Sequence, residues 1–321
     1  MNRDDGIKPG EKLILHYEDD PDTERVWTVL SYVGKGGSSV VFIAQSGCKI
    51  GILKVFEPHD SMENPDEELA SFLAPYRLLD KLKLENADFR ILNNYIPYSE
   101  ILWGVGYYEC YIWSPDDKQG IIFEEYIRKN ISDGRIGIHQ LYDVVHILEQ
   151  LTYCICSLHS LGLLHLDIKP SNFLVVYDRR NEISLGHVSL FDIDSIHMAD
   201  DENCRIKVTD GFSAPELYTG KSDNRSDIYS IGAVLFAALM TGKETELSVN
   251  RESLYGTLDD IIKMFIEHQK ATNVVEHRID ETLLRILKGC LNHNPNKRYP
   301  DCEALLEDIR RLESLLYPYM L

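Results

Sequence analysis

The sequence is poor in basic residues, and this shortage argues against some classes of ligand. It holds 33 lysines and arginines against 52 aspartates and glutamates, so its formal net charge is −19. A surface with this charge repels nucleic acid and anionic lipid, and we expect neither of them as a partner. A basic peptide would suit the charge better, although charge alone does not identify one.

The sequence also lacks a recognisable leader peptide and a membrane-spanning run. The stretch from Met1 to Glu11 is polar and has no apolar segment of the kind found in secretory leaders. The longest apolar run, Ile228 to Met240, is too short to cross a bilayer and contains Ser230 and Gly232. We interpret this run as a buried core helix and expect the protein to be cytoplasmic.

The seven cysteines show no metal-binding pattern, because no pair has C-x-x-C spacing and their number is odd. Cys154 and Cys156 lie two residues apart in a helical pattern and should therefore point in different directions. We interpret the cysteines as free thiols in a reducing compartment. His159 and His165, at a helix end and in a polar loop, are interpreted as structural rather than metal-binding residues.

The first third of the chain has the composition of strands, and the remainder is mostly helical. Hydrophobic residues make up 44% of the chain, enough for a large core. Strands rich in β-branched and aromatic residues are expected at 26–33, 40–44 and 50–56, and a strand pair at 107–113 and 120–126. Apolar spacing predicts helices at 66–84, 140–161, 222–240, 257–267, 281–291 and 301–316. Pro75 should kink or break the first of them.

The segment from His165 to Val176 carries the clearest chemical signal. Asp167, Lys169 and Asn172 are packed into six residues between apolar stretches. Asp167 can accept a proton from an attacking hydroxyl. Lys169 can neutralise charge on a transferring phosphoryl group, and Asn172 can offer its amide oxygen to a metal ion. A surface loop in which polar residues occur by chance is a poor explanation for three such residues within six.

Two weaker signals come earlier in the chain. Gly34 and Gly36, on either side of Lys35, follow a strand and allow a tight turn with N–H groups that can face phosphates, and Val41 lies on the next strand. Taken alone, these residues are better explained by a glycine hairpin that binds nothing. Lys54 lies on a mostly apolar strand face, where it either snorkels to solvent or binds an anion such as a nucleotide phosphate.

Three charged residues later in the chain suggest buried polar contacts. Asp192 ends a strand, where its carboxylate can hold Mg²⁺ or cap a turn. Asp227 opens the buried helix and should accept hydrogen bonds from backbone donors and so anchor a loop. A partly buried Arg298 needs a carboxylate partner, and Glu216, at the end of an Ala-Pro-Glu motif, is the candidate.

The order of these motifs resembles that of the eukaryotic-type protein kinase superfamily over about residues 27 to 315. The resemblance implies an α+β, bilobal fold: a small antiparallel β-sheet lobe with one main helix at 27–127, and a larger, mainly helical lobe at 128–321. Residues 1–26 would be an N-terminal extension, and the hinge would lie near 124–129. The resemblance assigns ATP binding to Gly34, Lys35, Gly36, Val41 and Lys54, catalysis to Asp167 and Lys169, and Mg²⁺ binding to Asn172 and Asp192.

For two further assignments the sequence leaves alternatives. The helix glutamate that pairs with Lys54 in this superfamily could be Glu67, Glu68 or Glu85, and we favour Glu68.

The backbone of the hinge normally contacts adenine, and Glu125 and Ile127 are the candidates here. Either Phe123 or Glu124 would then occupy the gatekeeper position.

The chain departs from the superfamily pattern at two positions. Leu166 replaces the arginine that normally binds a phosphate on the activation segment, which here would run from Asp192 to Glu216. We therefore expect activity without phosphorylation of that segment. Asp194 replaces the glycine of Asp-Phe-Gly, and we expect it to stiffen the loop rather than to add a second carboxylate near the metal.

Lys169 and Thr209 resemble the serine/threonine-specific members of the superfamily. The resemblance therefore predicts a serine/threonine protein kinase that uses ATP and Mg²⁺ and acts on a protein hydroxyl. The main alternative is a pseudokinase, a nucleotide-binding scaffold without turnover, suggested by Leu166 and Asp194. A small-molecule kinase is a third reading, and the intact Ala-Pro-Glu motif and Thr209 argue against it.

Overall fold

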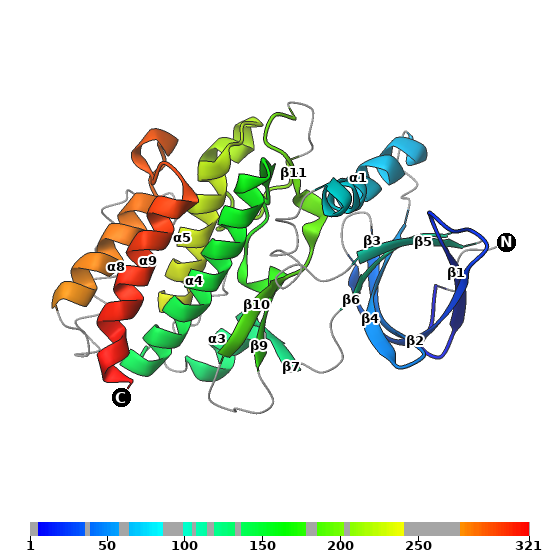
Figure 1. Ribbon diagram of the computed structural model, residues 1–321, viewed down its shortest axis with the longest axis horizontal. Coiled ribbons are helices and arrows are strands. Elements are labelled where there is room, and N and C mark those ends of the chain that lie inside the picture. Colours follow the sequence, from blue (N-terminus) through cyan, green and yellow to red (C-terminus); the bar gives the residue numbers. More distant parts are fainter. Residues whose placement is uncertain are drawn as a thin grey trace. The chain divides into compact units, whose positions relative to one another are not determined.

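The computed structural model describes residues 6–35, 39–57, 64–85, 99–104, 107–113, 119–131, 136–177, 185–201, 206–240 and 277–320. The chain forms two compact units, residues 1–118 and residues 119–321 (Figure 1). The lobes expected from the sequence, 27–127 and 128–321, divide the chain a little later, and that boundary stays a prediction. The α+β class with a strand-rich first part and a helical second part is confirmed.

The first unit is built on an antiparallel barrel of strands in the order β1-β2-β3-β4-β6-β5. Its strands are β1 (Lys12–Tyr17), β2 (Glu24–Lys35), β3 (Ser39–Ser46), β4 (Lys49–Phe56), β5 (Ser99–Gly104) and β6 (Tyr107–Trp113). Trp27 and Val29 of β2 point into the barrel core while Val26 and Leu30 are exposed, which is the period-two pattern of a half-buried strand. The expected strands at 26–33, 40–44, 50–56 and 107–113 are confirmed.

Strand β1 was not expected from the sequence, and it closes the barrel. It pairs with β2 on one side and with β5 on the other, where His16 is opposite Trp103 and Tyr17 is opposite Leu102. A closed barrel presents no free strand edge to other chains. Leu13 and Leu15 of β1, which lies within the segment expected as an N-terminal extension, belong to the core of the first unit.

The main helix of the first unit, α1 (Pro65–Glu85), runs through Pro75 without interruption. The expected break at this proline is wrong. A proline inside a helix costs roughly 3 kcal/mol, but Pro75 lies on the buried face of α1 together with Phe72, Tyr76 and Leu79. Burial of this apolar face offsets the lost backbone hydrogen bond.

The second unit contains the helices α3 (Phe123–Asn130), α4 (Ile138–Ser160), α5 (Asn224–Met240), α8 (His277–Cys290) and α9 (Cys302–Leu316). Helix α4 packs on α5 and α9, and α8 packs on the same two helices. The helices expected at 140–161, 222–240, 281–291 and 301–316 are confirmed, and the one expected at 257–267 lies outside the described residues. The run from Ile228 to Leu239 is buried throughout, as expected of a core helix.

Within the described residues, no helix combines the length and the apolar character that a membrane crossing requires.

Short strands and 3₁₀ turns join the helices of the second unit. A three-stranded sheet has the order β10-β9-β7, and β8 pairs with β11. These strands are β7 (Gln119–Ile122), β8 (Leu163–Leu164), β9 (Phe173–Tyr177), β10 (Leu185–Leu190) and β11 (His197–Met198). The 3₁₀ turns are η1 (Pro170–Asn172), η2 (Ile193–Ser195), η3 (Pro215–Thr219), η4 (Pro295–Lys297) and η5 (Tyr317–Tyr319).

The expected strand pair of 107–113 with 120–126 is wrong. Strand β7 ends at Ile122 and pairs with β9, whereas β6 pairs with β4 and β5. The chain becomes helical at Phe123, because Phe123, Tyr126 and Ile127 recur at the spacing of one helix face and are all buried. The ion pairs Glu124–Arg128 and Glu125–Lys129, one helical turn apart, support the same helix.

Candidate active site

In the first unit, three of the predicted nucleotide-binding residues lie in one row across the barrel sheet. Gly34 on β2 is opposite Val41 on β3, and Val41 is opposite Lys54 on β4. Directly opposite residues of antiparallel strands face the same side of the sheet, so Val41 and Lys54 are cross-strand neighbours. Lys54 is buried, with 7% of its surface exposed, which excludes a lysine that extends freely into solvent.

The other residues of the first unit that are predicted to bind the nucleotide are Lys35, Gly36 and Glu68, and none of them is part of this row as the structure describes it. Lys35 ends β2, and its Nζ lies 2.5 Å from Glu57 Oε2. Gly36 lies outside the described residues. Glu68 is half-buried in the first turn of α1, where its N–H donates to Asn64 O at 3.2 Å. Its pairing with Lys54 stays a prediction.

The two residues predicted to contact adenine lie on helix α3 rather than on an extended hinge. The carbonyl of Ile127 accepts a hydrogen bond from Ile131 N–H at 2.9 Å, and the side chain of Glu125 pairs with Lys129. The role of Glu125 and Ile127 in adenine binding stays a prediction.

In the second unit, the polar residues of the 165–176 segment converge on one carboxylate. The 3₁₀ turn η1 brings Asn172 back beneath Asp167, and Asn172 Nδ2 donates to Asp167 O at 2.9 Å and to Asp167 Oδ2 at 3.1 Å. Lys169 Nζ lies 3.0 and 2.9 Å from the two oxygens of the same carboxylate. The three polar side chains that the sequence singled out therefore form one cluster.

A threonine and a second lysine reach the same carboxylate from a distant part of the chain. Thr209 Oγ1 donates to Asp167 Oδ1 at 2.7 Å and accepts from Lys169 Nζ at 3.3 Å. Lys207 Nζ lies 3.4 Å from Asp167 Oδ2. Sequence reasoning missed Lys207, and the available signal was its place two residues before Thr209. Because Asp167 is buried, the charges of Lys169 and Lys207 act on its carboxylate in surroundings that screen charge poorly.

The two predicted metal ligands lie in segments that are linked through the backbone, before the start of β9 and after the end of β10. Phe173 is opposite Leu190 in register, and Phe191 N–H donates to Asn172 O at 3.0 Å, so Asp192 follows directly on a residue bonded to Asn172. Asp192 has a left-handed backbone with φ of 60°, a conformation uncommon outside glycine.

These donor types suit magnesium. Because Asn172 Nδ2 points to Asp167, the amide oxygen at the other end of the side chain is the atom that can face a metal. Among the described residues no group of three His, Cys, Asp or Glu side chains forms a ready-made metal site. Magnesium in phosphoryl-transfer sites is held by one or two protein oxygens together with substrate phosphates, and Asn172 and Asp192 fit that pattern.

Asp227, at the start of α5, anchors the loop that carries the cluster. Its carboxylate accepts from His165 N–H at 2.9 Å and from Leu166 N–H at 2.7 Å, and its Oδ2 lies 2.9 Å from His159 Nε2. Burial by itself would raise the pKa of Asp227, but the hydrogen bond and the charge of His159 hold that pKa below its ordinary value. The predicted anchoring role is confirmed, and His159 takes part in it as a structural residue.

The anchored loop has a special backbone at Leu166. This residue has a φ of 57° and a buried side chain. The position that holds arginine in the superfamily that the sequence resembles is therefore occupied here by an apolar side chain that packs in the core. Burial lowers the pKa of the neighbouring His165 and so favours the neutral form of its ring. Asp194 is half-buried in η2, and its stiffening effect stays a prediction.

Glu216 and Arg298 form the predicted buried ion pair. The guanidinium donates to both carboxylate oxygens, at 2.7 and 2.8 Å, and also to Arg225 O at 2.9 Å and to Asn292 O at 2.7 Å. Burial alone would raise the pKa of Glu216, but the hydrogen bonds and charge of Arg298 hold that pKa below its ordinary value. The pair fixes η3, which carries the Ala-Pro-Glu motif, to the turn before α9.

Comparison with known proteins gives consistent matches. A family model described as "Protein kinase domain" matches residues 27–308. Serine/threonine-protein kinase D of Synechocystis is 22% identical over 306 residues, which is 90% of this chain and 52% of the relative. Serine/threonine-protein kinase MPS1 of Encephalitozoon cuniculi is 25% identical over 283 residues, which is 87% of this chain and 42% of the relative. The chain thus spans about half the length of these curated relatives.

Solved structures show the same fold. The crystal structure of the Mycobacterium tuberculosis PknI kinase domain matches with a TM-score of 0.53 and 16% sequence identity, over 96% of this chain and 100% of the other. At this identity the likeness concerns the architecture alone, and it agrees with the expected bilobal α+β fold.

Proposed function

The chain belongs to the protein kinase domain family, and we propose that it transfers the γ-phosphoryl group of ATP to a serine or threonine hydroxyl of a protein substrate. The observation that carries this proposal is the convergence of Lys169, Asn172 and Thr209 on the carboxylate of Asp167. Phosphoryl transfer depends on positioning and on charge neutralisation more than on covalent chemistry, so a complete and well-ordered polar cluster is what the reaction requires.

Asp167 is proposed to act as the catalytic base. Its carboxylate accepts the proton of the attacking hydroxyl and orients that hydroxyl for in-line attack. Thr209 and Asn172 hold the carboxylate in place through their hydrogen bonds. Lys169, already within hydrogen-bond reach of Asp167, neutralises negative charge that develops on the transferring group.

The residues that would bind Mg²⁺ and ATP are those predicted from the sequence. Asn172 and Asp192 would hold Mg²⁺, which when bound would neutralise charge on the phosphates. Lys54, aided by Glu68, would contact the phosphates. Further contacts to ATP are proposed for Gly34, Lys35, Gly36, Val41, Glu125 and Ile127.

Serine and threonine are favoured over tyrosine as the acceptor. Lys169 and Thr209 are the residues that resemble the serine/threonine pattern, and in the structure they contact each other as well as Asp167. The curated relatives described above carry serine/threonine-kinase names. The alternative of a nucleotide-binding scaffold without turnover gains no support from these comparisons.

A transfer assay tests the proposal directly. The full chain with γ-labelled ATP and Mg²⁺ should label casein or itself, and removal of the metal with EDTA should abolish the labelling, because the charge of the phosphates is then no longer neutralised. A parallel thermal-shift measurement reports nucleotide binding independently of turnover. Stabilisation by Mg²⁺-ATP without any transfer of label would contradict the proposal.

Activity is expected to be independent of phosphate on the activation segment. Leu166 cannot bind a phosphate, and Ser195 and Ser213 are buried, with Ser213 Oγ accepting from Thr209 N–H at 2.7 Å. Protein treated with phosphatase should therefore phosphorylate casein at an unchanged rate. An activity that falls after phosphatase treatment and is also lost in Ser195→Ala or Ser213→Ala would show that this expectation is wrong.

A further inference from the structure

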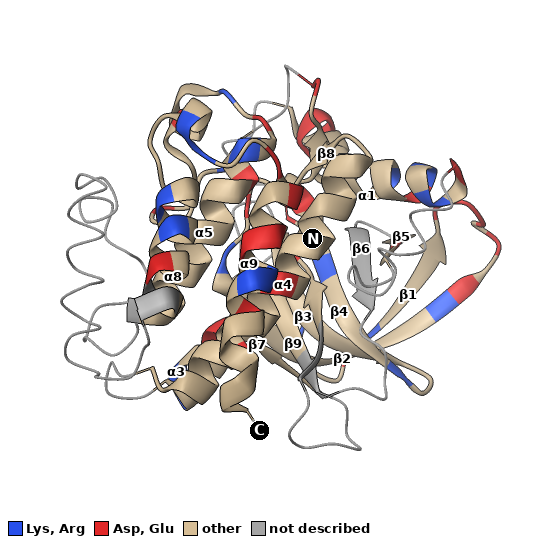
Figure 2. Cartoon of the chain, turned by 60° about the vertical axis from the view of Figure 1, so that its left-hand side comes forward, with Lys and Arg blue, Asp and Glu red and all other residues tan. Residues whose placement is uncertain are grey.

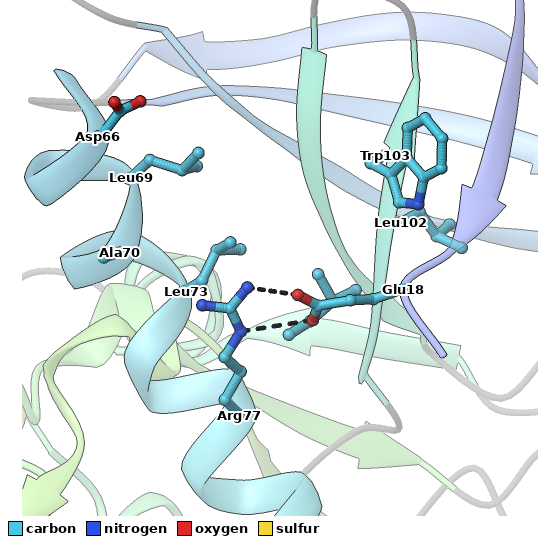
Figure 3. Close-up of a pocket in the computed structure, with 9 residues that line it drawn as sticks. Glu18, Asp66, Leu69, Ala70, Leu73, Arg77, Leu102 and Trp103 are labelled. Carbon is cyan, nitrogen blue, oxygen red and sulfur yellow. Dashed lines mark hydrogen bonds and ion pairs between the residues drawn. The ribbon is translucent and has the colours of Figure 1, made fainter. Parts of the chain in front are cut away.

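The turn that follows β1 is tied to helix α1 by a two-point ion pair. Arg77 Nε lies 3.4 Å from Glu18 Oε2, and Arg77 Nη2 donates to Glu18 Oε1 (Figure 3). The backbone of Glu18 is fixed as well, since its N–H donates to Ile101 O of β5 at 3.1 Å. Glu18 thus connects the barrel wall to the helix at a defined place.

Residues 65–71 of α1 contribute no buried side chain to the core of the first unit. The buried side chains of this helix begin at Phe72, while residues 65–71 are exposed or half-buried. A hollow of about 210 Å³ lies along the helix, with Leu69 and Leu73 on the helix side and Leu102 and Trp103 on the strand side (Figure 3). A helix segment with few buried contacts and an open space beside it can shift at low cost in free energy.

Glu68 lies in this part of α1 and is half-buried. The pairing of a helix glutamate with the strand lysine must be in place for phosphoryl transfer in protein kinases, so the position of the first two turns of α1 affects activity. Strand β1 and Glu18 precede residues 27–308, the span that the family model matches. The element that reaches Arg77 is therefore an addition to the matched domain.

We infer that β1 and Glu18 form a positioning element for α1, in which the Glu18–Arg77 ion pair holds the helix at the distance from the barrel at which Glu68 reaches Lys54. This inference rests on the proposed kinase function. Acidic residues, drawn red, follow one another through the turn after β1, which contains Glu18, Asp19, Asp20 and Asp22 (Figure 2). Arg77 is the residue of α1 that forms an ion pair with this acidic turn, through Glu18.

A charge-swap series in the full chain tests the inference. Glu18→Lys and Arg77→Glu each break the pair, and the double variant restores it with the charges exchanged. Both side chains are partly exposed, at 38% and 49%, so these variants should fold. Exposed ion pairs have modest energies, so each single change should lower kcat/KM for ATP about two- to five-fold, mainly through KM, and the double variant should recover most of that loss. Lys81→Glu, the same charge reversal at an exposed position of α1, is the matched control and should leave kcat/KM unchanged.

Hydrogen exchange of the α1 amides, measured on the same variants, separates failure of this inference from failure of the proposed function. The single variants should exchange faster than wild type over residues 69–77, and the double variant should return toward the wild-type rate. If wild type transfers no phosphate but exchange follows this pattern, the proposed function is wrong while the ion pair still positions α1. Single variants that behave like Lys81→Glu in both measurements, or a double variant whose losses simply add, would overturn the inference.

Discussion

Asp167→Asn should lower kcat about 10²- to 10⁴-fold while leaving ATP binding in place, because the amide cannot accept the proton of the attacking hydroxyl. The substitution keeps the shape of the side chain, and Thr209 can still donate to the remaining oxygen. Steady-state transfer to casein gives kcat, and the shift of the thermal transition on addition of Mg²⁺-ATP reports nucleotide binding. A large loss in the first without loss of the second is the expected pattern.

Asp308→Asn is the matched control for this experiment. Asp308 is also a carboxylate of the second unit, and it accepts hydrogen bonds from Arg285 and from Tyr299 on the helical side of that unit. Neutralising it should leave kcat unchanged. If Asp167→Asn retained wild-type kcat, Asp167 would not be the base, and the proposed mechanism would be wrong even if the chain is an active kinase.

Arg298→Met should lower the free energy of unfolding of the second unit by about 3–5 kcal/mol, because it leaves the buried carboxylate of Glu216 without its cation. The side chain of Arg298 is fully buried and that of Glu216 is 14% exposed, so solvent can do little to compensate. The double variant with Glu216→Gln should lose less than the sum of the two single losses, since it buries no unpaired charge.

The placement of the tryptophans provides an internal reference for this measurement. All three, Trp27, Trp103 and Trp113, belong to the first unit, so tryptophan fluorescence follows that unit while helical circular dichroism mainly follows the second.

Arg310→Met removes an exposed ion pair with Glu149 and should cost no more than about 1 kcal/mol. Equal losses for Arg298→Met and Arg310→Met would contradict the assigned role of the buried pair.

The polar cluster around Asp167 could be predicted from the sequence because its spacing is local. Three polar residues within six, bounded by apolar stretches, have few ways to be placed other than around one short loop, and η1 completes that loop. The Glu216–Arg298 pair is distant in sequence, yet it was predictable from the high free energy of a buried, unpaired arginine. Lys207 escaped notice because an exposed lysine in a loop has no comparable constraint.

Helix α3 and strand β1 show where local patterns fail. The run of residues 120–126 is short and apolar, and such a run fits a strand as well as a helix. The change from strand to helix at Phe123 depends on the burial of one helix face in the folded unit, which the local sequence does not reveal. The residues of β1 alternate well enough for a strand, but a strand gains its stability from partners, and one of them, β5, lies much later in the chain. The sequence around β1 does not specify that partner.

The late partner of β1 has a consequence for synthesis on the ribosome. Strands β1 to β4 emerge first and can form an antiparallel meander from neighbouring segments, whereas the seam between β1 and β5 closes only after Trp103 has left the exit tunnel. Closing contacts between distant segments costs more chain entropy than pairing neighbours, so this seam should form last and open first. Until it forms, the nascent sheet has exposed edges on which chaperones or neighbouring chains can act.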